Sequence, residues 1–157
     1  YNWGMIPSWA KDNEIRKYTL NAKIETVTEK PSFKNSVNKR CLVISNGFYE
    51  WKWLDPKGRI KNKYEIGLPN QELFCFAGLY SEWVDTSSGE IIHSYTILTT
   101  QANPFMAEIH NTKKRMPVVL NRADEAKWLQ HEPIENFALP YSVDLKAKNL
   151  DAPATLF

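Results

Sequence analysis

Residues 40–54 read RCLVISNGFYEWKWL and hold two strand-like segments on either side of a turn signal. The first segment, residues 41–45, is apolar apart from one serine, and the second, residues 48–54, is rich in aromatic side chains. Asn46-Gly47 between them is a strong signal for a hairpin or another tight turn. We therefore predict two strands, joined by a tight turn, as the centre of the fold.

Glu50 is the single carboxylate of this stretch and lies between Tyr49 and Trp51. Alternate side chains of a strand point to opposite faces, which places Phe48, Glu50 and Lys52 opposite Tyr49, Trp51 and Trp53. A carboxylate that aromatic neighbours remove from water has a raised pKa and suits acid–base chemistry. The alternative is an edge-strand glutamate that reaches water, and this stretch alone does not decide between the two.

The composition predicts one globular domain, residues 1–157. Apolar residues make up 43% and charged residues 24% of the chain, which is ordinary, whereas six tryptophans in 157 residues are unusual. Aromatic rings pack in cores by default, but beside basic residues they also suit stacking on nucleic-acid bases. The net charge of +2 permits nucleic-acid binding through a local basic patch without demanding it.

The two cysteines, Cys41 and Cys75, both lie in apolar strand-like runs, as expected of buried free thiols in a reducing compartment. They have no CxxC spacing, and the three histidines are scattered, so we expect no metal and no cofactor. No apolar stretch approaches the roughly 20 residues of a membrane span. We therefore expect a cytoplasmic monomer that does not associate with membranes.

The remaining pattern predicts an α+β fold, built on a mainly antiparallel, barrel-like sheet with a few short helices. The DTSSG segment at residues 85–89 is expected to connect two strands as a hairpin. Besides the central stretch, strands are expected at residues 63–67, 73–84 and 91–100.

Two helices are expected in the second half of the chain. Asn103-Pro104 is a helix start that would deliver His110 at the helix end. Asn121 is expected to cap a second helix over residues 122–130. Residues 131–157, which prolines interrupt, are expected to wrap around the body.

Three polar residues are candidates for chemistry: Asn21, Glu50 and His110. They offer an amide, a carboxylate and an imidazole that titrates near neutral pH. They lie 29 and 60 residues apart in the chain, so the spacing alone does not show that they meet. Residues 29–38, a basic stretch that contains Phe33, are either a solvated loop or a phosphate-contacting patch.

A series of short motifs runs along the chain: WGMIPSW (3–9), NAKIET (21–26), KPSF (30–33), RCLVISNGFYEW (40–51), FAGLY (76–80), TTQAN (99–103), and IH followed by RMPVVL (109–120). Each motif alone is weak, but the ordered combination is specific. The series closely resembles the bacterial members of the SRAP family, the SOS response-associated peptidases or abasic-site processing proteins. The resemblance extends to about residue 145.

The resemblance implies a DNA-repair protein of the SOS response that binds single-stranded DNA containing an abasic site. Family members link the ring-opened sugar aldehyde to the α-amine and thiol of an N-terminal cysteine, which closes a thiazolidine. An amine forms a Schiff base with an aldehyde, and a neighbouring thiol traps the imine. The same nucleophilic N-terminus would explain a self-cleaving peptidase activity, so both hydrolase and lyase-like chemistry are implied.

Site residues follow from the matched motifs. Asn21 would position the terminal cysteine or a sugar hydroxyl. Glu50 would move protons during ring opening and removal of the initiator methionine, and His110 would be its acid–base partner at the sugar oxygen or imine. The same matches, together with the basic stretch, imply a set of DNA-contacting residues that stack on bases or hold phosphates: Trp3, Pro7, Trp9, Lys23, Lys30, Phe33, Thr99, Arg115, Met116 and Pro117.

The sequence departs from the family pattern in three respects. The catalytic N-terminal cysteine is absent from the 157 residues, and we expect it in a segment that precedes Tyr1. Lys23 stands where the family has arginine, which keeps the charge but loses the bidentate fork. Four residues, NTKK, separate His110 from Arg115, and this spacing is longer than usual in the family.

Two other functions are open at this point. A non-catalytic module that binds single-stranded DNA would use the same groove. A hydrolase would pair His110 with Cys41 or Cys75, although both thiols lie in apolar strands rather than in an activating environment.

Overall fold

The computed structural model describes residues 1–70 and 72–152, so residues 153–157, the end of the predicted domain, lie outside the described residues. The strands are β1 (Asn2–Trp3), β2 (Asn21–Lys23), β3 (Arg40–Ser45), β4 (Phe48–Trp53), β5 (Lys61–Gly67), β6 (Phe74–Val84), β7 (Ile91–Gln101), β8 (Arg115–Pro117), β9 (Val119–Leu120) and β10 (Lys146–Asn149). The α-helices are α1 (Pro104–Ile109) and α2 (Glu125–Leu129), and the 3-10 helices are η1 (Glu14–Tyr18), η2 (Ile24–Thr26), η3 (Lys34–Ser36), η4 (Arg122–Asp124) and η5 (Ile134–Phe137).

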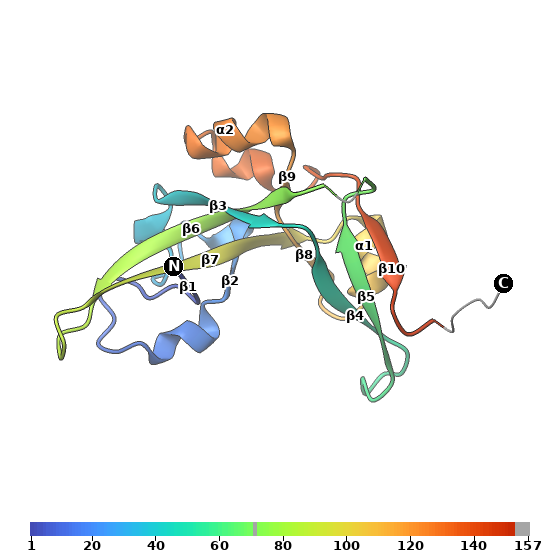
Figure 1. The fold of residues 1–157 in the computed structure, drawn as a ribbon, viewed down its shortest axis with the longest axis horizontal. Helices are drawn as coiled ribbons and strands as arrows, with labels where there is room; N and C mark the ends of the chain where they lie inside the picture. The colour runs from blue at the N-terminus through green and yellow to red at the C-terminus, as the bar shows by residue number, and fades with distance from the viewer. Residues whose placement is uncertain (71, 153–157) are drawn as a thin grey trace.

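A long antiparallel hairpin, β6 with β7, forms the spine of the larger sheet (Figure 1). Among the described residues this sheet has seven strands: β7 also pairs with β1, β2 and β8, and β6 also pairs with β3 and β9. The strands β1 and β2 run parallel to β7, and the other pairs are antiparallel. The turn of the hairpin is the predicted DTSSG segment, in which the carboxylate of Asp85 accepts the N–H of Ser87 at 2.8 Å.

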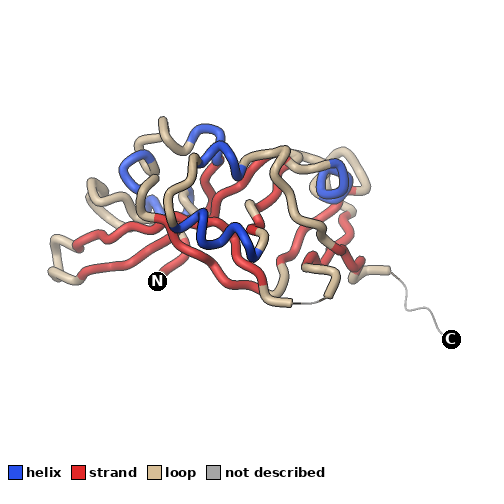
Figure 2. Tube along the Cα trace, turned by 90° about the horizontal axis from the view of Figure 1, so that it is seen from above, coloured by secondary structure: helices blue, strands red, loops and turns tan. Residues whose placement is uncertain are grey.

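The smaller sheet has three strands, in the order β10-β5-β4, and lies at the opposite end of the molecule from the tip of the β6–β7 hairpin (Figure 1). Figure 2 shows the short helix α1 beside this sheet. The predicted α+β class with mainly antiparallel strands is confirmed, but the described strands form two open sheets rather than one barrel-like sheet. The strands expected at residues 63–67, 73–84 and 91–100 correspond to β5, β6 and β7.

Asn46-Gly47 forms a bend that connects a strand of one sheet to a strand of the other. Of the two predicted possibilities, a hairpin or another tight turn, the hairpin is therefore wrong. β3 pairs with β6 in the larger sheet, whereas β4 pairs with β5 in the smaller one. The hydroxyl of Ser45 fixes the bend, because it donates to the carbonyl of Gly47 at 2.6 Å and accepts its N–H at 3.2 Å. A side chain at Gly47 would approach the carbonyl oxygen of Ile66 to 3.0 Å, which explains a glycine at this close crossing.

β4 lies at the edge of the smaller sheet and shows the predicted alternation. Tyr49 and Trp51 are 50% and 46% exposed, whereas Phe48 and Glu50 face inward and are partly buried. The β4–β5 connection contains the turn of residues 55–58. It is closed by the carboxylate of Asp55, which accepts the N–H of Ile60 at 2.7 Å. The strand therefore presents Tyr49 and Trp51 on its outer face and Phe48 and Glu50 on its inner face.

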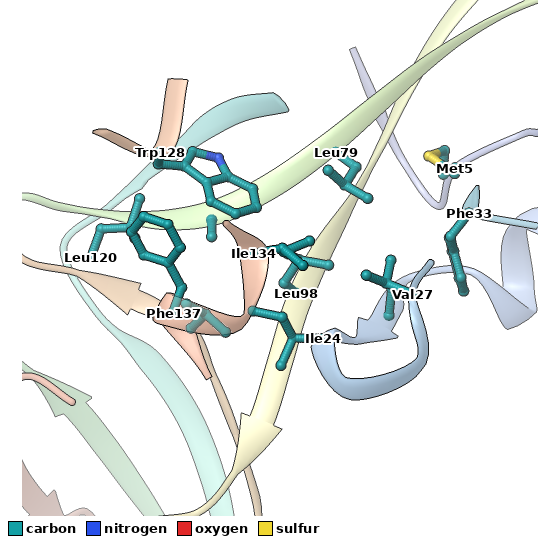
Figure 3. Packing of buried hydrophobic residues seen from close by; sticks show 13 residues of the cluster. Met5, Ile24, Val27, Phe33, Leu79, Leu98, Leu120, Trp128, Ile134 and Phe137 are labelled. Carbon is teal, nitrogen blue, oxygen red and sulfur yellow. The ribbon is translucent and has the colours of Figure 1, made fainter. Parts of the chain in front are cut away.

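The main core packs against the larger sheet, and Trp128 of α2 is its largest fully buried side chain (Figure 3). The Trp128 indole packs edge-on against Phe137 at 5.2 Å between ring centroids, and its N–H donates to the carbonyl of Cys41 at 3.0 Å. The C-terminal part of the chain thus closes the core with α2 and η5, and then adds β10 to the smaller sheet. The helix expected over residues 122–130 is split into η4 and α2, and the side chain of Asn121 makes no capping hydrogen bond.

The predicted helix start at Asn103 is confirmed. Asn103 caps the first turn of α1, and His110 follows the last residue of this helix. The side chain of Asn103 accepts the N–H of Met106 at 2.8 Å, and Pro104 occupies the first helical position. We predict that Asn103→Ala lowers the free energy of unfolding by about 1 kcal/mol. Denaturant unfolding would measure this loss. Asn121→Ala is the matched control, since that asparagine also precedes a helix without capping it, and an equal loss in both variants would contradict the capping role.

Candidate functional site

A pocket of about 530 Å³ opens where the two sheets meet. Strands of both sheets contribute to it, together with the loop between α1 and β8. The pocket is lined by Asn21, Lys23, Glu50, Trp51, Trp53, Lys61, Thr99, His110, Thr112, Lys113, Arg115, Met116 and Pro117.

The fold brings the three candidates for chemistry together in this pocket. Asn21 comes from β2, Glu50 from β4 and His110 from the end of α1. The other predicted site residues that line the pocket are Lys23, Thr99, Arg115, Met116 and Pro117. The predicted residues that do not line it are Trp3, Pro7, Trp9, Lys30 and Phe33.

Glu50 and His110 face each other, with Oε1 of the carboxylate 4.0 Å from Nδ1 of the imidazole. Both side chains are only 21% exposed. Burial raises the pKa of Glu50, while the nearby His110 and a hydrogen bond with the backbone of Trp51 partly oppose the rise. The carboxyl group can therefore hold or release a proton closer to neutral pH than an ordinary glutamate.

The imidazole of His110 is oriented by the backbone of Arg115. Nδ1 lies 2.7 Å from the carbonyl oxygen of Arg115 and 3.3 Å from the backbone nitrogen of the same residue, so the main chain of Arg115 holds this edge of the ring. His110 thus supplies an imidazole that can exchange a proton and whose orientation the main chain fixes.

Arg115, which was predicted to contact a phosphate, is held by an acidic partner. Its guanidinium donates to both carboxylate oxygens of Glu25, at 2.9 and 2.8 Å, and also to the carbonyl oxygen of Thr99 at 2.6 Å. Burial favours the protonated form of Glu25, but the hydrogen bonds and charge of Arg115 outweigh it and leave the pKa of Glu25 below its usual value. Glu25 was not predicted as a site residue, although it is the one acidic residue of the NAKIET motif.

Cations and indoles that were not among the predicted site residues also line the pocket. Trp51 and Trp53 follow Glu50 on β4, and Lys61 lies opposite Trp53 on β5, with its ammonium group 4.9 Å from the ring centre. The alternation of aromatic and charged residues that begins at Glu50 could have indicated Trp51 and Trp53 as site residues. Lys23 is exposed, and within residues 1–70 and 72–152 it forms no salt bridge, so its charge is available to a polyanion.

Trp3 and Trp9 remain suited to stacking, since they are 47% and 52% exposed. Their indole N–H groups donate to the carbonyl oxygens of Leu20 (2.8 Å) and Pro31 (3.1 Å), which fixes the rings next to the segments that hold Asn21 and Lys30. Lys30 itself is exposed.

Three other predicted contacts are buried instead. Phe33 and Met116 are 8% and 2% exposed, and Pro7 is also buried. The Phe33 ring belongs to the main core, so it cannot stack on a base in this conformation. Met116 packs in the core between α1 and the smaller sheet. These side chains shape the pocket or the core rather than an open DNA surface.

The two free thiols do not belong to the site. Burial raises the pKa of Cys41 to about 11, and burial with the nearby Glu125 raises that of Cys75 to about 11. Both thiols are thus protonated at neutral pH, and neither lines the pocket that holds His110. The arrangement gives no support to a hydrolase built on a Cys–His pair.

The described part of the chain contains no cluster of three or more histidine, cysteine or acidic side chains that could hold a metal ion. In the same residues, no helix is long and apolar enough to cross a membrane.

A partly buried carboxylate faces an imidazole, in a pocket that indole rings and ammonium groups also line. The fold and site thus define an α+β protein with a paired carboxyl and imidazole group in a pocket between two sheets. The chain belongs to the SOS response associated peptidase (SRAP) family, whose model matches residues 1–151.

The similar proteins agree with this assignment. The chain is 43% identical over 148 residues to the abasic site processing protein YoaM of Bacillus subtilis, covering 90% of this chain and 63% of YoaM. It is 35% identical over 151 residues to the abasic site processing protein HMCES of Xenopus tropicalis, covering 81% of this chain and 43% of HMCES. The chain thus spans less than two thirds of either relative.

Solved structures are similar across nearly the whole chain. A protein from Bacteroides thetaiotaomicron superposes with a TM-score of 0.85 at 36% identity, covering 95% of this chain and 67% of that chain. A protein from Bordetella bronchiseptica superposes with a TM-score of 0.81 at 27% identity, covering 94% and 74%. The fold of this chain therefore matches the fold of these two proteins of known structure.

Proposed function

We propose that this protein processes abasic sites in single-stranded DNA by forming a covalent cross-link with the sugar, in DNA repair during the SOS response. One observation carries the proposal: Glu50, with its raised pKa, and His110 lie 4.0 Å apart in a pocket that also holds Asn21 and several lysines. The names of the relatives YoaM and HMCES support an abasic site as the substrate.

The pair can carry out the proton transfers that this reaction needs. An abasic sugar is a cyclic hemiacetal, and its ring opens when a proton moves from the C1′ hydroxyl to the ring oxygen, which leaves an aldehyde. Glu50 would transfer this proton. An amine then adds to the aldehyde, and His110 would move the proton that the amine releases to the former aldehyde oxygen, which gives a carbinolamine. The hydroxyl of the carbinolamine takes up one proton and leaves as water, which gives the iminium ion. Addition of the thiol to the iminium carbon closes the thiazolidine and releases one proton.

We propose that the amine and thiol belong to an N-terminal cysteine of the mature protein, which the 157 residues do not include. Neither Cys41 nor Cys75 can replace it, because neither has a free α-amine and both have a pKa of about 11. The same terminal cysteine would account for self-cleaving peptidase activity.

The rest of the pocket suits a single strand of DNA. Ammonium groups would contact phosphates, and indoles would stack on the bases beside the lesion. Asn21 would hold the sugar hydroxyl or the terminal amine. The residues that we propose for strand binding are Trp3, Trp9, Lys23, Lys30, Trp51, Trp53, Lys61 and Lys113.

The proposal is tested by incubating the complete protein with a single-stranded oligonucleotide that carries one abasic site. We expect a shifted band that survives denaturation. A strand with a tetrahydrofuran in place of the abasic sugar is the matched control, because it cannot form an aldehyde and should give no such band. Binding to both strands without a covalent band would favour the non-catalytic DNA-binding module instead, and no binding at all would contradict both functions.

Trp51 is expected to contribute to strand affinity by stacking on a base. Trp51→Ala should weaken binding of the tetrahydrofuran strand by about 1–2 kcal/mol, or roughly 5- to 30-fold. Fluorescence anisotropy would measure the dissociation constant. Tyr18→Ala is the control, since Tyr18 is 77% exposed and does not line the pocket. Equal effects of the two substitutions would argue against a specific stacking role.

A further inference from the structure

The residue that follows His110 ties the α1–β8 loop to the strand that carries Glu50. Oδ1 of Asn111 accepts the N–H of Trp53 at 3.0 Å, and Nδ2 of the same side chain donates to the carbonyl oxygen of Trp53 at 2.8 Å. Among the described strands β4 pairs only with β5, so its other edge is open. The amide of Asn111 therefore occupies the place of a neighbouring strand along this edge.

We propose that Asn111 is a positioning residue that fixes the separation of Glu50 and His110. The inference rests on the proposed function and deepens it. Glu50 lies three residues before Trp53 on β4, and His110 is the residue immediately before Asn111. The two reactive side chains come from segments 60 residues apart in sequence, and the Asn111 amide joins those segments by two hydrogen bonds next to the site.

Two other contacts help to place the loop: the carbonyl oxygen of Lys114 accepts the N–H of Ala102 at 2.9 Å, and Ile109 of α1 packs in the same core as Phe48 of β4. Among the described residues, the two bonds of Asn111 are the hydrogen bonds that join the loop itself to β4. The N–H of Lys114 donates to the carbonyl oxygen of His110 at 3.1 Å, so residues 110–114 form a single turn. The Arg115 carbonyl oxygen orients the imidazole from within the same segment of the chain. A shift of the loop away from β4 would lengthen the 4.0 Å separation of Nδ1 and Oε1. Misplacement of a catalytic group by about 1 Å is enough to cost up to 100-fold in rate.

The chemistry of the side chain is specific. A primary amide offers one acceptor and two donors on a short, planar group, and it matches the N–H and C=O of a single residue. Aspartate has the same shape but only accepts, so Asn111→Asp keeps the bond from the Trp53 N–H and places a second oxygen against the Trp53 carbonyl. Asn111→Ala removes both bonds.

The first test measures cross-linking by the complete protein under single-turnover conditions. We expect Asn111→Ala and Asn111→Asp to lower the maximal rate by about 10-fold. The dissociation constant for the tetrahydrofuran strand should stay within about 2-fold, since the loss concerns reaction rather than binding. Asn149→Ala is the matched control, because this partly exposed asparagine also bonds the backbone, at the N–H of Asp151, but lies on β10 away from the pocket. An unchanged rate, or an equal loss in the control, would overturn the proposal.

The second test needs no DNA and so separates this inference from the proposed function. In Asn111→Ala the amide of Trp53 should exchange with solvent faster. The pH at which the carboxyl group of Glu50 titrates, followed by NMR, should change, because burial raises the pKa of Glu50, His110 opposes this rise, and both influences depend on the position of the loop. The other charged side chains that line the pocket, Lys23, Lys61, Lys113 and Arg115, are unchanged in the variant. Unaltered exchange and titration would overturn the positioning role even if the protein cross-links DNA. If both change while the complete protein forms no cross-link, the positioning of the pair stands and the proposed function fails.

Discussion

Glu50→Gln in the complete protein is expected to slow cross-linking to abasic single-stranded DNA by about 100-fold or more. Glutamine keeps the size and polarity of the side chain but cannot exchange a proton. The loss should appear in the single-turnover rate at saturating DNA, because ring opening then lacks its proton carrier. Affinity for the tetrahydrofuran strand should hardly change, since this strand requires no proton transfer.

Glu65→Gln is the control for this substitution. Glu65 is an exposed carboxylate on the adjacent strand β5, opposite Tyr49, and does not line the pocket. The Glu65→Gln variant should cross-link abasic DNA at the rate of the unsubstituted protein. If Glu50→Gln weakened binding as much as it slowed the reaction, the role of Glu50 would be structural rather than in proton transfer.

The stability of Glu50→Gln provides a second check on the same group. Folding raises the pKa of Glu50, so the contribution of this carboxyl to stability is present below the pKa of an ordinary glutamate and is lost as the pH rises through the raised value. The glutamine variant should therefore be more stable than the unsubstituted protein at neutral pH, and this difference should vanish at acidic pH. Such a carboxylate is retained at the expense of stability, as is typical of active-site groups.

The sequence predicts the local structure of residues 40–54 but not its partners. Both strands and the alternation around Glu50 are confirmed, because they depend on side chains that are neighbours in the chain. The hairpin reading of Asn46-Gly47 is wrong, because pairing depends on competition between distant strands. β3 pairs with the long apolar strand β6, and β4 pairs with β5, the next strand in the chain. A turn signal reports a change of direction and carries no information about the sheet that follows.

The candidate site likewise combines features that the sequence predicts with features that depend on the fold. The motif series identified Asn21, Glu50 and His110, which do line one pocket, although their spacing could not show it. Phe33 was predicted to contact DNA from within a basic stretch, but its ring packs in the core. The partner of Arg115 lies 90 residues away, and no local pattern pairs the two. The function of a charged residue depends on what compensates its charge, and that is a property of the fold.

Glu25→Gln is expected to have the largest effect on stability among these substitutions, about 2 kcal/mol lost from the free energy of unfolding. The Arg115 side chain is only 17% exposed and would keep its charge without the carboxylate that compensates it. A fully buried pair would cost more to break, but Glu25 retains some contact with water. The loss should appear in denaturant unfolding. Glu14→Gln, which breaks an exposed ion pair with Lys17, should cost far less.

A double-mutant cycle would show whether the effect of Glu25 depends on Arg115. Arg115→Met removes the guanidinium, so adding Glu25→Gln to it should cost about 1–2 kcal/mol less than Glu25→Gln alone. The pH dependence has the opposite sign to that of Glu50. Folding lowers the pKa of Glu25, so its contribution is present above the ordinary carboxyl pKa and is lost as the pH falls through the lowered value. Acid should therefore erase the defect of Glu25→Gln. Additive losses in the cycle, or a defect that persists unchanged in acid, would mean that Glu25 acts through some contact other than its ion pair with Arg115.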